Sequence, residues 1–181
     1  MRERRSASDL RRAREFDAFA AGAAGRLLRT AALLTAEPPG ATPRAQRLLV
    51  ASLARTYAEW GRLRDADPYD HTRRDLALRF AHGAWRARWT ERDGAGGTAA
   101  RSQENRPPYP RSPLGSLTPQ ERLVLVLRLH EGLAEEQTAS LLGLPEDRIR
   151  ALCARAMAAL REGARPPRVP RSGTGSREAG R

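Results

Sequence analysis

The sequence contains no lysine and a single cysteine among its 181 residues, and aromatic residues make up only 5% of it. The lone Cys153 excludes an internal disulfide and any zinc site built on clustered cysteines. Proteins without disulfides are typical of reducing compartments, so we expect a cytoplasmic protein. No apolar run has the length of a signal peptide or a membrane span, which predicts a soluble chain with no membrane partner.

Motifs of catalysis and cofactor binding are also missing from the sequence. The histidines His71, His82 and His130 have neither the spacing of metal ligands nor that of a nucleophile and its base. No glycine-rich phosphate loop is found either. We therefore expect no metal, no cofactor and no enzymatic activity.

What the chain does have is positive charge. Its 33 basic residues outnumber 21 acidic ones, which gives a formal net charge of +12 and an isoelectric point near 11.4. A polyanion is the expected partner, with nucleic acid ahead of an anionic membrane surface. Arginine suits paired contacts with phosphate and guanine, although codon bias in a GC-rich genome would also explain the absence of lysine.

The first half shows three helical patterns. After a basic leader at residues 1–13, apolar residues recur at the spacing of one helix face and stop before Pro38. Thr42 is the expected N-cap of a second helix, and Asp67, followed by proline, is that of a third. These patterns predict a helical domain over residues 14–89.

The second half begins after a change of composition. Residues 90–116 are rich in glycine, proline, serine and arginine and predict a flexible linker. Order resumes over 117–162, where Thr118 and Glu121 have the spacing of a capping box, and residues 163–181 are expected to be a disordered basic tail. With no β pattern, the predicted fold is all-α, with two small helical domains joined by the linker.

The C-terminal domain has the spacing of a helix-turn-helix. A short helix over 134–142 is followed by Gly143 for the tight turn, and a longer helix starts near Pro145, with Ile149 and Cys153 facing the core. The N-terminal end of the second helix enters the major groove in this motif. The alternative is an ordinary helical hairpin, and the net charge favours DNA.

Three arginines on the second helix are the candidate DNA contacts. Arg148 and Arg150 lie near its N-terminal end and can read guanine edges. Arg155 follows further along and is better placed for phosphate.

The segment LTPQERLVLVLRLHEGLAEEQTASLLGLPEDRIRALCARAMAALRE resembles region 4 of extracytoplasmic-function (ECF) RNA polymerase sigma factors, which are members of the sigma-70 family. The first half, with Leu53-Ala54-Arg55-Thr56-Tyr57 and Trp60, resembles region 2 of the actinobacterial SigE-like branch. The resemblance implies an alternative sigma factor that directs promoter recognition and transcription initiation with core RNA polymerase. Region 2 would bind the polymerase clamp and melt the −10 element, and region 4 would bind the −35 element and the flap.

The resemblance also implies individual contacts in region 2. Leu49, Leu53 and Arg55 fall on the helix that faces polymerase, although the acidic residues usual in this helix are replaced here by residues such as Arg47 and Ala51. We regard the chain as a divergent member for this reason.

A second group of implied contacts concerns promoter DNA. Arg73 and Arg74 match paired arginines that track the promoter backbone. Trp85, with Arg86 and Arg88, has the composition of a platform for unpaired bases, and partial burial of the tryptophan is the alternative.

Two other functions remain open from the sequence. The chain would be a DNA-binding regulator if it kept the sigma fold but lost productive polymerase binding. It would be an interaction module if its apolar faces served to titrate an anti-sigma factor.

Overall fold

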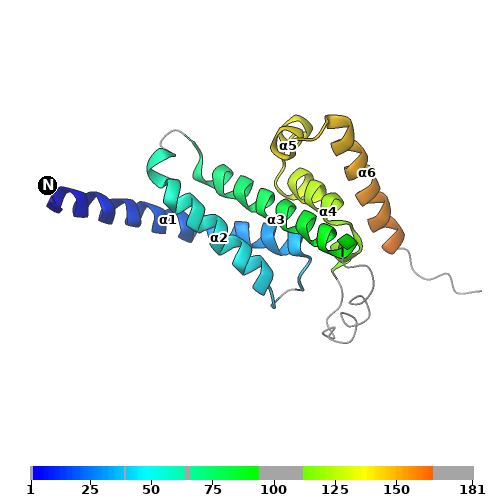
Figure 1. Ribbon diagram of the computed structural model, residues 1–181, viewed down its shortest axis with the longest axis horizontal. Helices are drawn as coiled ribbons and strands as arrows, with labels where there is room; N and C mark the ends of the chain where they lie inside the picture. The colour runs from blue at the N-terminus through cyan, green and yellow to red at the C-terminus, as the bar shows by residue number, and fades with distance from the viewer. Residues whose placement is uncertain (1, 39, 64–65, 94–111, 165–181) are drawn as a thin grey trace, which may run out of the picture.

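The computed structural model describes residues 2–38, 40–63, 66–93 and 112–164, and every regular element in these ranges is helical, which confirms the all-α prediction (Figure 1). For residues 2–7 and 85–93 only the backbone is described. The helices are α1 (Arg2–Thr35), α2 (Pro43–Glu59), α3 (Pro68–Asp93), α4 (Pro119–Leu125), α5 (Glu135–Leu142) and α6 (Glu146–Gly163). Short 3-10 turns occupy Trp60–Arg62 and Pro113–Ser116, and a π-helical turn, Val126–His130, continues α4. None of the described helices combines the length and apolarity needed to cross a bilayer.

Helix α1 begins earlier than the apolar pattern indicates. The basic leader continues the helix as far back as Arg2, and these first turns project beyond the rest of the molecule (Figure 1). Arginine, glutamate and alanine are good helix formers, so the leader needs no buried face to be helical. Arg12 links it to α2, because its guanidinium donates a 2.9 Å hydrogen bond to the Tyr57 carbonyl and lies 4.9 Å from the ring centre.

The start of α2 differs from the prediction. Thr42 precedes the helix, but its side chain makes no capping hydrogen bond. The carboxylate of Glu37 does so instead, accepting hydrogen bonds from the backbone N–H groups of Arg44 at 2.9 Å and Ala45 at 2.8 Å. At α3 the prediction is confirmed, because Asp67 Oδ1 accepts a 2.9 Å hydrogen bond from the backbone N–H of Tyr69.

Helices α1, α2 and α3 enclose the first core. Leu27, Leu34 and Leu76 are fully buried there. A 2.8 Å hydrogen bond between the hydroxyls of Thr56 and Thr72 pairs the buried threonines of α2 and α3. The buried hydroxyl of Ser52 on α2, in contrast, has no hydrogen-bond partner among the described residues.

Helix α4 joins this bundle. Leu123, Val126 and Leu127 belong to the same buried cluster as the leucines of α1 and α3. On its other side α4 packs against α6 (Figure 1). The separation into two domains stays a prediction, since residues 94–111 of the expected linker and most of the expected tail lie outside the described residues.

Candidate nucleic-acid interface

The predicted helix-turn-helix is formed by α5 and α6. Gly143 adopts a left-handed conformation, with φ of 64°, and reverses the chain in the few residues between the two helices. Ala139 of α5 packs with Ile149 and Leu152 of α6 and with Val124 of α4, all of them buried. This small core holds α6 by its inner face and leaves the opposite face in solvent.

The capping box predicted at the start of α4 is also present. Thr118 accepts a hydrogen bond from the backbone N–H of Glu121, and the Glu121 carboxylate accepts one from the backbone N–H of Thr118 at 3.1 Å. The cap fixes the direction in which α4 enters the bundle. It therefore also sets the platform against which α6 packs.

All three predicted arginines of α6 are on its outer face. Arg148 is exposed, and its side chain forms no ion pair with any described residue. Arg150 is held between Glu135 at 3.0 Å and Asp147 at 2.8 Å, and Arg155 bonds to Glu121 at 3.2 Å.

These ion pairs shift the ionisation of the groups involved. The hydrogen bond that Arg150 donates to Glu135 raises the pKa of Arg150, with added attraction from the charges of Glu135 and Asp147. Burial would raise the pKa of Glu121, but hydrogen bonds from Thr118 and Arg155 outweigh it and hold that pKa below its usual value. Both shifts favour the charged form, so Arg150 and Glu121 are ionised at neutral pH.

The predicted residues of α3 fall into three situations. Arg74 is exposed. Arg73 is largely covered, with its side chain 16% exposed, and it forms ion pairs with Asp70 at 2.9 Å and with Glu131 at 3.7 Å. Trp85, Arg86 and Arg88 continue the helix, but their side chains lie outside the described residues.

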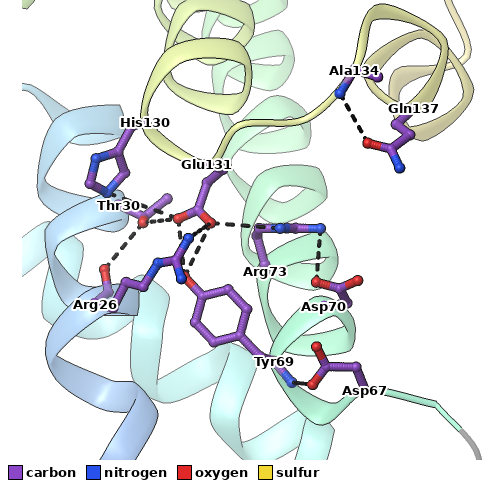
Figure 2. A network of polar contacts seen from close by, with 10 residues as sticks. All are labelled: Arg26, Thr30, Asp67, Tyr69, Asp70, Arg73, His130, Glu131, Ala134 and Gln137. Carbon is purple, nitrogen blue, oxygen red and sulfur yellow. Dashed lines mark hydrogen bonds and ion pairs between the residues drawn. The ribbon is translucent and has the colours of Figure 1, made fainter.

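The partner of Arg73, Glu131, is the centre of a polar network between the two halves of the chain. It directly follows the π-helical turn, and its side chain is completely buried between α1 and α3 (Figure 2). Its carboxylate accepts hydrogen bonds from Thr30 and from the Tyr69 hydroxyl at 3.1 Å, and it pairs with Arg26 at 3.4 Å. We call Glu131 and these partners, with Arg73, the Glu131 network.

A second polar contact joins the halves at the other end of α4. Arg122 donates hydrogen bonds to the carbonyls of Leu34 at 3.0 Å, Leu114 at 2.9 Å and Leu117 at 3.0 Å. Burial lowers the pKa of Arg122, and nearby Arg44 lowers it further. The Leu34 carbonyl belongs to the last turn of α1, where the helix dipole favours a cation.

Comparison with known proteins agrees with this geometry. Residues 114–162, which contain α4, α5 and α6, match the family described as Sigma-70, region 4. The RNA polymerase sigma-E factor of Streptomyces coelicolor is 31% identical over 155 residues, which cover 82% of this chain and 85% of that protein. The sigma-E factor of Streptomyces avermitilis is 30% identical, and the alignment covers 82% of this chain and 84% of that protein. The sigma-E factor of Streptomyces antibioticus is 33% identical, and the alignment covers 69% of this chain and 74% of that protein.

The chain belongs to the sigma-70 family of RNA polymerase sigma factors. The aligned length reaches well beyond region 4, so the relationship includes the first half of the chain. This confirms the predicted resemblance to ECF sigma factors of the actinobacterial sigma-E type. As a sigma factor, the protein directs transcription initiation through sequence-specific DNA binding.

In this sigma factor, the helix expected to face polymerase is α2. Leu49 lies in the core, Leu53 is half-buried against it, and Arg55 is exposed and pairs with Glu59 of the next turn. Val50, at 65% exposed, is the most exposed large apolar residue of this helix, and Tyr57 is 39% exposed. The aliphatic residues predicted from the resemblance therefore hold α2 in place, and their neighbours form its surface.

Sequence reasoning missed the Glu131 network altogether. Glu131 directly follows His130, in a stretch that reads as a helix end, and no local pattern distinguishes it from a solvated glutamate. Its partners lie 58 to 105 positions earlier in the chain, so only the tertiary fold brings them together. The only local signal is Gly132, whose φ of 72° turns the chain directly after it.

Proposed function

We propose that this sigma factor reads the −35 promoter element with α6, through Arg148 and Arg150, and contacts neighbouring phosphates with Arg155. The observation that supports this most is the position of Arg148, which is exposed in the first turn of a helix whose opposite face is fixed by a buried core. A side chain in that position is presented to base edges when such a helix enters the major groove. The partners would be promoter DNA and core RNA polymerase.

The −10 element would be contacted by α3. Arg74 is available on its surface, and we assign it to the DNA backbone together with Arg73. Trp85, Arg86 and Arg88 follow on the same helix and are proposed to stack on and pair with the melted strand. Contacts of arginine with the DNA backbone give affinity, and contacts with the bases give the sequence preference.

The polymerase contact would be made by the outer face of α2. Val50 supplies apolar surface and Arg47 and Arg55 supply positive charge around it. Acidic residues usual in related proteins are absent here, so this interface would be weaker or would meet a differently charged partner surface. A cytoplasmic location, and an anti-sigma factor that covers the same face, are further parts of the proposal.

Transcription with purified core polymerase tests the proposal. The full chain should bind core polymerase in co-purification and initiate from a selected promoter. DNA binding without polymerase binding would indicate a regulator built on the sigma fold. Absence of both would favour the module that titrates an anti-sigma factor.

The role of α2 has its own test. Arg47→Asp should strengthen binding to core polymerase, because it restores the acidic charge usual in this helix, and it should leave binding to duplex −35 DNA unchanged, because the two sites lie on different helices. Arg14→Asp, at another exposed arginine on α1, is the matched control for the change of charge. Equal effects of the two variants would show that α2 has no specific role in this contact.

A further inference from the structure

Four side chains of α1 and α3 converge on the carboxylate of Glu131, three of them as hydrogen-bond donors and Arg73 as an ion-pair partner at 3.7 Å, and the neighbouring His130 lies 3.9 Å away. Arg26 and Thr30 come from α1, and Tyr69 and Arg73 come from α3, so the donors belong to the first half of the chain and the acceptor to the second (Figure 2). The guanidinium of Arg26 stacks 4.8 Å from the Tyr69 ring centre, which fixes both side chains toward the carboxylate. Without Glu131, α1 and α3 would present two arginines and two hydroxyls at one point.

This donor set is suited to a monoanion with several oxygens. A carboxylate removed from water loses several kcal/mol of hydration, which only charged and well-aligned donors can replace. Arginine pairs are the usual protein partners of phosphate oxygens, and hydroxyl donors complete the shell. Burial and Glu131 together raise the pKa of Tyr69 to about 12, so its hydroxyl remains a proton donor at every physiological pH.

We propose that α1 and α3 form a phosphodiester-binding site for the promoter backbone, and that Glu131 occupies it as an internal substitute for the phosphate. The inference rests on the proposed function in one respect, the assignment of Arg73 to promoter DNA. A phosphodiester carries one negative charge and two free oxygens, as the carboxylate does. DNA backbone and Glu131 therefore compete for the same four donors.

The length of a promoter supports the replacement of Glu131 by a DNA phosphate at this site. By their positions, the −10 and −35 elements lie about 25 base pairs apart from centre to centre, which at about 3.4 Å each is on the order of 80 Å along the duplex. In the structure α3 and α4 are in direct contact, and α6 itself is only about 27 Å long by helix rise. Both elements cannot be engaged until α4 leaves α3, and that movement withdraws Glu131 and opens the site.

The closed arrangement is held at two further places. The Arg122 hydrogen bond to Leu34 lies at one end of α4, Glu131 lies beyond the other, and Leu123 and Leu127 are buried between them. Opening exposes this apolar surface, so the closed state predominates until a ligand stabilises the open one. In the free protein, Glu131 thereby prevents non-specific binding of nucleic acid to this site.

The experiment uses the full chain and a fluorescein-labelled 20-nucleotide oligothymidine, which lacks the duplex that α6 needs. Glu131→Gln should bind it at least tenfold more tightly than the unmodified protein, measured by anisotropy at fixed ionic strength. Glu162→Gln, at an exposed position on α6, changes the charge equally and should alter affinity less than twofold. Equal gains in the two variants, or no gain in Glu131→Gln, would overturn the proposal.

A second variant separates the binding site from a merely structural network. Arg26→Gln should also loosen the closed arrangement, because it removes a partner of Glu131, but it removes a phosphate donor as well. Its oligothymidine affinity should therefore not rise, and adding it to Glu131→Gln should abolish most of the gain. If Arg26→Gln gains as much as Glu131→Gln, the effect is opening alone and the site does not bind phosphate.

Opening itself is measured by the distance between spin labels at the exposed positions Ala18 on α1 and Ala158 on α6, in a Cys153→Ser background. A single short distance should broaden to longer ones in Glu131→Gln and on addition of oligothymidine to the unmodified chain. If Glu131→Gln loses helical content, Arg122→Gln replaces it, since it removes the hydrogen bond to Leu34 that holds the closed arrangement and leaves all four donors in place. Loss of −35 duplex binding in Arg148→Ala is scored separately, so a failure of the proposed function would not be mistaken for a failure of this site.

Discussion

The Glu131 network and the ion pairs of α6 use the same two kinds of group, arginine and carboxylate, in opposite surroundings. The Glu131 side chain is fully buried, whereas those of Glu135 and Asp147 are 32% and 91% exposed. A buried carboxylate has no water to return to, so its partners fix the position of the helix that carries it. The exposed pairs are weak and exchangeable, which leaves the α6 arginines available to DNA.

The largest effect on stability is expected where the carboxylate is buried. Glu131→Ala removes the acceptor of the Tyr69 hydroxyl and one of the two carboxylate partners of Arg73, and removal of one member of a buried pair costs about 3–5 kcal/mol. Urea denaturation should show this loss in the free energy of unfolding. Glu136→Ala, at an exposed position on α5, should change it by no more than about 0.5 kcal/mol. A loss below about 1 kcal/mol in Glu131→Ala would mean that water reaches the network.

On the exposed side, the effect should fall on DNA binding instead. Arg148→Ala should weaken binding to the preferred −35 duplex by about 1–3 kcal/mol and relax base preference, as loss of a base contact does. Arg150→Ala should cost less, because that arginine must first release Glu135 and Asp147. Titration of duplexes with single base changes measures both quantities. Equal weakening on all sequences would assign these arginines to phosphate.

Ionisation of the Tyr69 hydroxyl at high pH reports on the state of the Glu131 network. Its pKa of about 12 in the folded protein lies above the usual value of 10.0, so the folded state holds this proton more tightly than the unfolded state. The stabilisation is complete below pH 10 and is lost as the pH rises toward 12. Absorbance at 295 nm should show one tyrosine that ionises at a higher pH than the others, and this transition should be absent in Tyr69→Phe. If the transition persists in that variant, another tyrosine has the raised pKa.

The same contrast explains what the sequence could and could not predict. The capping box of Thr118 and Glu121, the turn at Gly143 and the buried position of Ile149 depend on residues a few positions apart, and all three were predictable. The cap of α2 by Glu37 and the Glu131 network depend on how separate segments meet. No helical period or cap signal encodes those meetings, because they follow from the packing of α1, α3 and α4.

The smallest expected effect concerns Glu135, the half-buried carboxylate that holds Arg150. Glu135→Gln removes the pairs with Arg150 at 3.0 Å and Arg128 at 3.6 Å and an acidic group from the first turn of α5. Exposed pairs contribute about 0.2–1 kcal/mol and a helix-dipole contact a similar amount, so the free energy of unfolding should fall by no more than about 1 kcal/mol.

Release of Arg150 should at the same time strengthen binding to −35 duplex DNA severalfold, with a steeper dependence on salt, since one more cation is free to displace counterions. Glu162→Gln again controls for the change in net charge. A large loss of stability, or weaker DNA binding, would show that Glu135 positions Arg150 for the base instead of competing with it.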